Sequence, residues 1–203
     1  MTEPLLFQGP FFDHLMTQAP LAGTRYFSHG SFSLLFEDDT RLFRLTRDGG
    51  GHVFLVKESA AGNPHVVKVL KDYGPVAPSD EDRQIGFYYW LAEVERLQEL
   101  PAEDERTLRL EQALDLMEYD SADLAEQIEE ASKAFPEFQS LFQTLELARR
   151  FAHACGDLPD PSISNVMLRP STGEWVWVDA LTSTEYLPDE ATLLRLEAMR
   201  AGN

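Results

Sequence analysis

Runs of β-branched and aromatic residues dominate the chain between residues 26 and 71. Short segments rich in Asp, Gly, Ser and Pro separate these runs, and turn residues between apolar stretches are typical of antiparallel strands. The pattern therefore predicts a meander of strands with the sequences SFSLLF, RLFRLTR, HVFLVKE and HVVKVLK.

A helical period follows the predicted strands. Apolar residues recur mostly at three-residue steps between Ile85 and Leu100, just before a proline. Ser79 is the expected N-cap, and Asp82 stands at the capping-box position. We therefore predict a helix over residues 79–100.

The rest of the chain combines helices with short strands. Residues 1–25 are irregular apart from a short helix near FFDHLMTQ. The elements expected after residue 100 are a strand pair over 107–119, helices over 121–133 and 137–155, a hairpin over 165–180 and a helix over 189–201. Strands first and helices later in one chain indicate an α+β fold.

The composition describes a globular protein. Of the 203 residues, 43% are hydrophobic and 11% are aromatic, which is enough for a sizeable core. No apolar run approaches the roughly 20 residues that span a bilayer, and the N-terminus lacks the pattern of a secretory signal. We expect a cytoplasmic monomer without a membrane span, although an address read by a dedicated secretion system would leave no such pattern.

Acidic residues outnumber basic ones by 35 to 17, which gives a net charge of −18. This balance argues against nucleic-acid binding, which depends on cationic contacts to phosphate, and it favours partners with a basic contact face. The single cysteine, Cys155, excludes an intramolecular disulfide, and its apolar helical context predicts a buried, unreactive thiol.

Polar residues flank the predicted hairpin at regular spacing. Asp160 and Asn165 are five residues apart before its first strand, and Asp179 ends the second strand. Because a hairpin folds back, Asn165 and Asp179 can approach one metal–phosphate cluster. Asp157 is eight residues from Asn165 and does not fit this spacing. The structural alternative is that Asp160 and Pro161 form a turn and that Asp179 caps a strand.

Two upstream segments and one position of the predicted helix carry further polar or small residues. Gly30, Ser31 and Ser33 form a loop of small residues that lets backbone N–H groups approach phosphate; the alternative is an ordinary turn before a strand. Lys68 lies among apolar neighbours in VVKVLK, where a buried ammonium requires an anion; the alternative is a solvent-facing lysine on an edge strand. Glu93 follows 25 residues later, between apolar residues of the predicted helix, where a solvated glutamate is the alternative.

The order of these parts resembles that of the eukaryotic-like protein-kinase superfamily across residues 28–179. Kinases carry, in this order, a glycine-rich loop, a lysine, a helix glutamate, a hinge, a catalytic Asp, an Asn and a metal-binding Asp. The segment LDLMEYDSADL resembles the hinge. There the resemblance implies Met117 as gatekeeper and adenine binding by the backbones of Glu118 and Asp120.

The resemblance implies an ATP- and Mg²⁺-dependent Ser/Thr protein kinase. In this arrangement Lys68, held by Glu93, binds the α- and β-phosphates of ATP. Asn165 and Asp179 hold Mg²⁺, and Asp160 takes the proton of the acceptor hydroxyl. Tyrosine and small-molecule hydroxyls stay open as acceptors.

The implied fold is a minimal kinase. It has an N-terminal extension over residues 1–25, an antiparallel β N-lobe with one αC-type helix over 26–119, and a truncated, mainly helical C-lobe over 120–203. Leu158 and Pro159 replace the usual His-Arg, so control by loop phosphorylation is not expected. The short chain after the metal-binding Asp leaves no room for the subdomain that docks peptides. This layout is similar to the small type III effector kinases that bacterial pathogens inject into host cells, which implies a host protein as substrate.

Two other functions stay open. A pseudokinase would use the same fold to bind a nucleotide or a partner. The loop SHGSFSLLF favours it, because Ser28 and Ser33 stand where kinases carry glycines and only Gly30 is retained. The presence of Lys68, Glu93, Asp160, Asn165 and Asp179 together counts against a pure scaffold, which has no physical need for all five. The third function is transfer of AMP, instead of the γ-phosphate, by the same fold.

Overall fold

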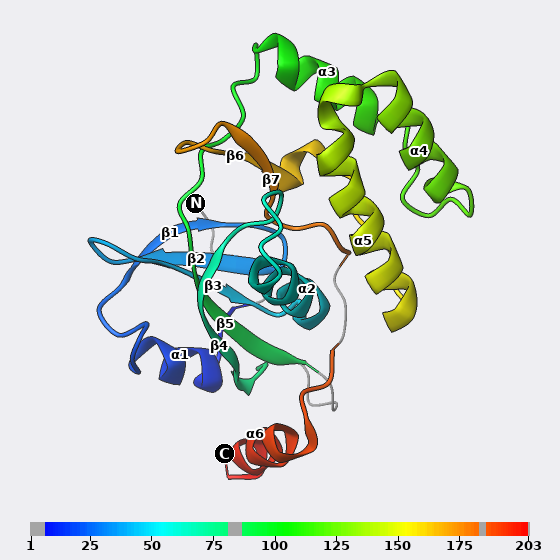
Figure 1. Cartoon of the computed structure of the whole chain (residues 1–203). Coiled ribbons are helices and arrows are strands. Elements are labelled where there is room, and N and C mark those ends of the chain that lie inside the picture. Colours follow the sequence, from blue (N-terminus) through cyan, green and yellow to red (C-terminus); the bar gives the residue numbers. More distant parts are fainter. Residues whose placement is uncertain (1–6, 81–86, 183–185, 203) are drawn as a thin grey trace. The chain divides into compact units, whose positions relative to one another are not determined.

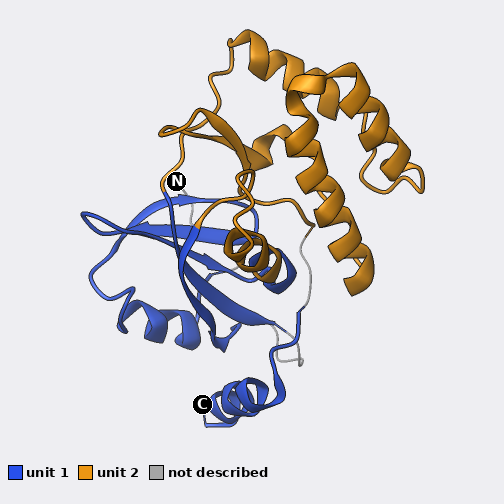
Figure 2. Cartoon of the chain, viewed as in Figure 1, with its two compact units in different colours: residues 1–52, 69–95, 185–203 blue, residues 53–68, 96–184 orange. Residues whose placement is uncertain are grey.

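The computed structural model describes residues 7–80, 87–182 and 186–202 of the chain (Figure 1). The fold is α+β, with a five-stranded antiparallel sheet, a two-stranded hairpin and, within the described ranges, six α-helices. The chain forms two compact units: unit 1 contains residues 1–52, 69–95 and 185–203, and unit 2 contains residues 53–68 and 96–184 (Figure 2). The units interleave along the chain, whereas the sequence led us to expect two lobes that follow one another.

Unit 1 is built on the five-stranded sheet, in which the strand order is β1-β2-β3-β5-β4 and every neighbouring pair is antiparallel. The strands predicted at residues 31–36 and 41–47 are confirmed as β2 and β3. The bounds are β1 Arg25–His29, β2 Ser33–Glu37, β3 Leu42–Thr46, β4 Val69–Pro78 and β5 Tyr88–Val94.

One face of this sheet carries the apolar core of unit 1. Successive side chains of a strand point to opposite faces, so alternate residues such as Phe36, Phe43 and Leu91 share one side and are buried there. Phe11 and Leu15 of helix α1 (Pro10–Met16) belong to the same buried cluster. The short helix predicted near the N-terminus is therefore confirmed.

The predicted C-terminal helix is confirmed as α6 (Glu190–Ala201), which belongs to unit 1 although it comes late in the chain. Arg195 Nη2 donates to Pro75 O of β4 at 2.8 Å. The hydroxyl of Tyr88 donates to Glu197 Oε1 at 2.8 Å. These bonds attach α6 to β4 and β5 across more than a hundred residues of sequence.

The strand predicted over residues 52–58 is wrong, because this segment lies in helix α2 (Gly49–Ala60). Asp48 Oδ1 accepts a hydrogen bond from Gly51 N at 2.9 Å, and Asp48 O accepts one from His52 N at 3.2 Å. An aspartate that accepts from the first turn starts a helix. The sequence DGGG was interpreted as a turn between strands, whereas it is the N-terminus of a helix.

His52 of α2 packs on the second face of the sheet. Its ring lies 5.2 Å from the ring of Trp90, centroid to centroid, and its Nε2 atom lies 2.9 Å from Asp72 Oδ1. Burial lowers the pKa of His52 from its ordinary value of 6.5, the charge of Arg44 lowers it further, and Asp72 opposes both. The folded protein therefore holds this histidine neutral more strongly than the unfolded chain does.

We predict that His52 makes the fold sensitive to mild acid. Because the folded pKa is depressed, its contribution to stability is complete above pH 6.5 and is lost as the pH falls below that value. The free energy of unfolding in urea should fall between about pH 7.5 and pH 5 more in the wild type than in His52→Gln. Equal pH dependence in the two proteins would contradict this assignment.

The helix predicted over residues 79–100 is also wrong. Residues 88–94 of this segment form strand β5, and Ser79 N donates to Phe87 O at 2.9 Å, as in a strand connection. Asp82 and Ile85 lie outside the described residues. The sequence YYWLAEV is rich in aromatic residues that fit a pleated, buried surface. A three-residue spacing of apolar residues did not distinguish helix from strand here.

Unit 2 contains the remaining helices and the hairpin. The helices predicted over 121–133 and 137–155 and the hairpin predicted over 165–180 are confirmed. The strand pair predicted over 107–119 is wrong, because Asp104 Oδ1 accepts from Arg106 N at 2.9 Å and Thr107 N at 3.3 Å and so starts helix α3. The bounds are α3 Glu105–Leu114, α4 Leu124–Ala134, α5 Gln139–Cys155, β6 Val166–Arg169 and β7 Glu174–Trp177.

Helix α5 and strand β7 form the centre of unit 2. Trp177 and Phe142 are fully buried, and Trp177 Nε1 donates to Leu141 O at 3.1 Å. This contact joins the hairpin to the longest described helix. In the ranges given above, no helix is both long and apolar enough to cross a membrane.

Candidate functional site

Asp160 lies half-buried in the loop between α5 and β6. Its backbone N–H donates to Ala180 O at 2.9 Å, and Pro159 and Leu181 form an antiparallel bridge beside this bond. The loop that carries Asp160 is therefore attached to the segment that directly follows Asp179.

Asn165 is hydrogen-bonded both to the loop that carries Asp160 and to the segment that leads to Asp179. Its Nδ2 atom donates to Asp160 O at 3.4 Å, and its backbone O accepts from Val178 N at 2.9 Å. Ser162 accepts from Ser164 N at 3.3 Å at the start of the short turn that ends at Asn165. Because the amide nitrogen faces Asp160 O, the amide oxygen of Asn165 is directed elsewhere and can face a cation.

Asp179 follows Val178, the residue that donates to Asn165. Its side chain is half-buried, and its Oδ1 atom is closed off from solvent. The structure thus brings Asp160, Asn165 and Asp179 together within unit 2 through backbone hydrogen bonds of the loop and the hairpin.

The donor atoms of this group suit Mg²⁺ in the presence of a nucleotide. No cluster of three or more His, Cys, Asp or Glu side chains able to hold a metal ion occurs among the described residues. Mg²⁺, however, usually takes only one or two protein carboxylates together with phosphate oxygens and water. The carboxylate of Asp179 and the amide oxygen of Asn165 fit that pattern.

Lys68 lies close in the chain to a contact with the hairpin. Val66 and Trp177 form a parallel bridge, flanked by backbone hydrogen bonds of 2.9 and 3.0 Å. Lys68 and Asp179 are each two residues beyond this bridge on neighbouring segments that run in the same direction. Lys68 is exposed and precedes β4, so the buried inner-strand position expected for it is wrong.

Arg169 anchors the segment before Lys68 to the hairpin. Its side chain is 1% exposed. Its Nη1 atom donates to Pro64 O at 2.6 Å and to Glu174 Oε2 at 2.7 Å, and its Nη2 atom donates to Val66 O at 2.9 Å. A single buried guanidinium therefore joins β6, β7 and the chain that leads into Lys68.

Glu93 does not lie on a helix. It is part of β5, where its Cα pairs with those of Phe43 and Lys71 on the neighbouring strands. Paired residues share a face of the sheet, so Glu93 lies on the side of Phe43, which is the apolar core side. The helical position expected for Glu93 is therefore wrong, and its pairing with Lys68 stays a prediction.

Gly30 and Ser31 lie in the turn between β1 and β2, and Ser33 begins β2. Gly30 N donates to Ser33 O at 2.9 Å, which closes the turn and uses one of the N–H groups expected to face phosphate. Phe32 O accepts from Thr46 Oγ1 at 2.9 Å, which attaches the turn to the end of β3. Ser31 is exposed at the turn.

The adenine-binding hinge expected at residues 114–124 is not supported by the backbone. Glu118 N donates to Gln127 Oε1 at 2.8 Å, and Glu118 O accepts from Ser121 N at 3.0 Å. Both polar backbone groups of Glu118 are thus used within unit 2, in the connection between α3 and α4. Asp120 lies exposed in the same connection.

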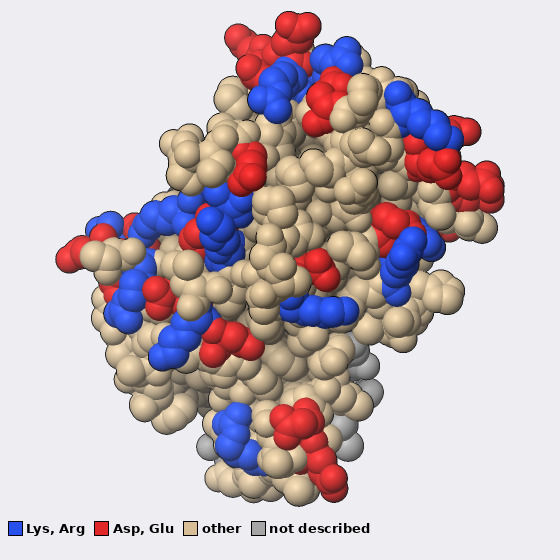
Figure 3. Space-filling model, viewed as in Figure 1, with Lys and Arg blue, Asp and Glu red and all other residues tan. Residues whose placement is uncertain are grey.

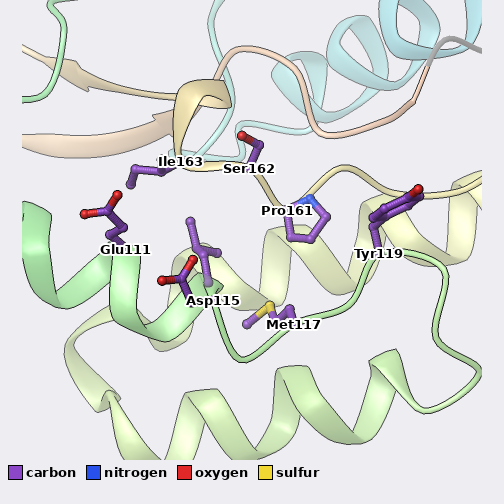
Figure 4. Close-up of a pocket in the computed structure, with 8 residues that line it drawn as sticks. Glu111, Asp115, Met117, Tyr119, Pro161, Ser162 and Ile163 are labelled. Carbon is purple, nitrogen blue, oxygen red and sulfur yellow. The ribbon is translucent and has the colours of Figure 1, made fainter.

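Met117 instead lines a pocket of about 310 Å³ beside the loop of Asp160. One wall is formed by Pro161, Ser162 and Ile163, which directly follow Asp160, and the other by the end of α3 and the residues after it (Figure 4). The remaining lining residues are Glu111, Leu114, Asp115 and Tyr119.

Arg44 is a basic residue that the sequence analysis did not select. It lies on β3 and is 6% exposed, with its Cα paired to those of Leu35 and Ala92 on the neighbouring strands. Because Phe43 and Leu45 point to the apolar core, Arg44 points to the opposite face. The signal was present in RLFRLTR, where this arginine occupies the alternate position between two core residues.

Cys155 was expected to be buried, and this is wrong, since the residue is exposed at the end of α5. Partial burial of its thiol and the negative charge of Asp157 both raise the pKa of Cys155. The thiol is therefore kept protonated and is a poor nucleophile.

Charged residues of both signs are present on the surface. On the face drawn in Figure 3, Lys and Arg side chains alternate with Asp and Glu side chains over both units. The net charge of −18 therefore does not form a field of a single sign on this face.

Comparison with known proteins identified no relative: no protein-family model matches the chain, and a search of curated proteins found no match. The function is therefore inferred from the residues and their geometry.

Proposed function

We propose that this chain is an ATP- and Mg²⁺-dependent phosphotransferase, a minimal protein kinase that transfers the γ-phosphate to a Ser or Thr hydroxyl of a protein. The observation that carries the proposal is the set of backbone hydrogen bonds that gathers Asp160, Asn165 and Asp179. The order of elements also supports it, since strands β1 to β3 are followed by a helix, two strands, further helices and the hairpin.

The proposed roles follow from the chemistry of each side chain. Asp160 orients the acceptor hydroxyl and takes its proton. Asn165 and Asp179 hold Mg²⁺, which when bound neutralises charge on the phosphates. The three groups need no large movement to act together, because the loop and the hairpin are already joined.

The cation that binds the phosphates has two candidates. In kinases this residue lies on the third strand and pairs with a glutamate of the following helix. The two candidates are Lys68, which the sequence analysis selected, and Arg44, the basic residue within β3.

A nucleotide- or partner-binding module without catalysis is the second candidate function. Two observations favour it. The turn at Gly30 uses its own N–H internally, and Lys68 is exposed. Such a module would bind ATP or a protein and transfer nothing.

Label transfer separates these functions. The purified protein is incubated with a protein substrate, Mg²⁺ and ATP labelled at the γ- or the α-phosphate, beside Asp179→Ala, Lys68→Ala and Arg44→Met. We expect γ-label in the substrate with the wild type and none with Asp179→Ala. Calorimetry of ATP binding to the other two variants identifies the phosphate-binding cation.

The matched control is Asp104→Ala, which removes the aspartate that caps α3 and should transfer label normally. Incorporation of α-label would contradict γ-transfer and indicate AMP transfer. ATP binding without any incorporation would indicate the binding module. The absence of both ATP binding and label incorporation would contradict the proposal.

A further inference from the structure

Asp157, which its spacing excluded from the metal site, lies at the junction of three chain segments. Helix α5 ends at Cys155, and Gly156 follows in the left-handed conformation with φ 78°. Asp157 N donates to Ala152 O at 2.9 Å, a bond typical of helix ends with a left-handed glycine. The backbone of Asp157 is therefore held against the last turn of α5.

The side chain of Asp157 bonds to the following loop residue and to the segment beyond Asp179. Its Oδ1 atom accepts from Leu158 N at 2.7 Å and from Thr182 Oγ1. Thr182 is joined to the same place by its backbone, since Thr182 N donates to Leu158 O at 3.0 Å. One carboxylate oxygen thus connects the start of the Asp160 loop to the segment beyond Asp179.

The bonds of Asp157 and Thr182 continue along the same two segments as the backbone bonds of the candidate site. The segments 157–160 and 180–182 run antiparallel, joined in turn by the Thr182 bonds, the Pro159–Leu181 bridge and the bond from Asp160 N to Ala180 O at 2.9 Å. The short ladder ends at Asp160 on one segment and beside Asp179 on the other.

We propose that Asp157 and Thr182 form a positioning pair that sets the separation between Asp160 and Asp179. The inference rests on the proposed phosphotransfer function and extends it to two residues that touch neither substrate nor metal. Because reacting groups must be held closely, a displacement of about 1 Å can reduce the rate about 10²-fold.

The pair is not expected to matter as much for stability. Both side chains are only half-buried, and partly exposed polar pairs contribute little to the free energy of folding. A loss of activity without a matching loss of stability is therefore the result that distinguishes positioning from a structural role.

The test compares Asp157→Ala, Thr182→Val and the double variant with Asp157→Asn, which keeps the oxygen that accepts both bonds. Asp104→Ala is the control, because Asp104 also accepts two backbone hydrogen bonds, but at the start of α3. For each protein, kcat and KM for ATP are measured in the phosphotransfer assay, and the unfolding midpoint is measured in urea.

We expect Asp157→Ala and Thr182→Val each to lower kcat by about 10- to 100-fold, with KM for ATP changed by less than about 3-fold. The kcat of the double variant should equal that of the less active single variant, because both changes remove the same interaction and their effects do not add. Asp157→Asn should retain most of kcat, and Asp104→Ala should keep wild-type kcat.

Three outcomes would overturn the positioning role: wild-type kcat in Asp157→Ala, additive losses in the double variant, or a loss of kcat in Asp104→Ala in proportion to its lower unfolding midpoint. If the wild type transfers no phosphate, the proposed function itself fails and the positioning role fails with it. If the wild type transfers phosphate and the variants have the same kcat, the positioning role is contradicted, whereas the proposed function is not.

Discussion

Replacing Asp160 with asparagine should lower the rate of γ-phosphate transfer by about 10²- to 10⁴-fold, because an amide cannot accept the proton of the acceptor hydroxyl. The local structure should persist. The bonds to Ala180 O and from Asn165 Nδ2 use the backbone N–H and C=O of residue 160, which the substitution leaves in place. The rate is measured with γ-labelled ATP at saturating substrate, and ATP binding is measured in parallel by calorimetry.

The matched control is Asp189→Asn, which makes the same chemical change at the residue that caps α6. It should leave the rate unchanged. ATP should bind to Asp160→Asn with nearly wild-type affinity, since the residue is assigned to proton transfer and not to the nucleotide. A variant that keeps more than about a tenth of the rate would place the base elsewhere.

Replacing Arg169 with methionine should reduce the free energy of unfolding by about 3–5 kcal/mol. The side chain is buried, and it satisfies Pro64 O, Val66 O and one oxygen of Glu174. Methionine fills a similar volume but donates no hydrogen bond, so two backbone carbonyls lose this donor. Glu174 Oε2 loses its charged partner and keeps only the bond from Thr172 Oγ1 at 2.8 Å. Urea unfolding of the purified variant measures the change.

Arg150→Met provides the comparison for Arg169→Met. The side chain of Arg150 is 69% exposed and forms an ion pair with Glu146 on the surface of α5. Removing such a pair should cost less than about 1 kcal/mol. Equal losses in the two variants would show that burial of the guanidinium does not determine its contribution.

The arrangement around Asp160 could be predicted from sequence because its parts are close in the chain. Two short apolar runs with turn residues between them specify a hairpin, and a hairpin brings the residues at its two ends together. Asn165 and Asp179 are such residues. The spacing rule was too narrow in one respect: it set Asp157 aside, although this residue joins the same two segments through Thr182.

The five-stranded sheet was predicted less well, because some of its strands and the neighbouring helix α2 have similar local sequence patterns. The segments HVFLVKE and YYWLAEV are both short and apolar, and the first is a helix while the second is a strand. The deciding interactions are the helix start at Asp48 and the pairing of β5 with β3 and β4. The second of these joins residues far apart in sequence, which periodicity does not detect.

The hinge was predicted from a resemblance of side chains, whereas its proposed role depends on free backbone groups. Gln127, nine residues after Glu118, takes the N–H that adenine was expected to use. Nothing in the side chains of residues 114–124 indicates this bond. Arg44 was overlooked for a related reason, because the search for a cation followed lysine and not the burial of alternate residues on a strand.

The late attachment of α6 has a consequence for synthesis. A ribosome makes strands β1 to β5 and the whole of unit 2 before the helix that binds Pro75 and Tyr88 emerges. The sheet of unit 1 cannot complete its packing as a nascent domain, although many domains fold in order from the N-terminus during translation. A chain stalled before residue 190 would present this uncovered surface to chaperones.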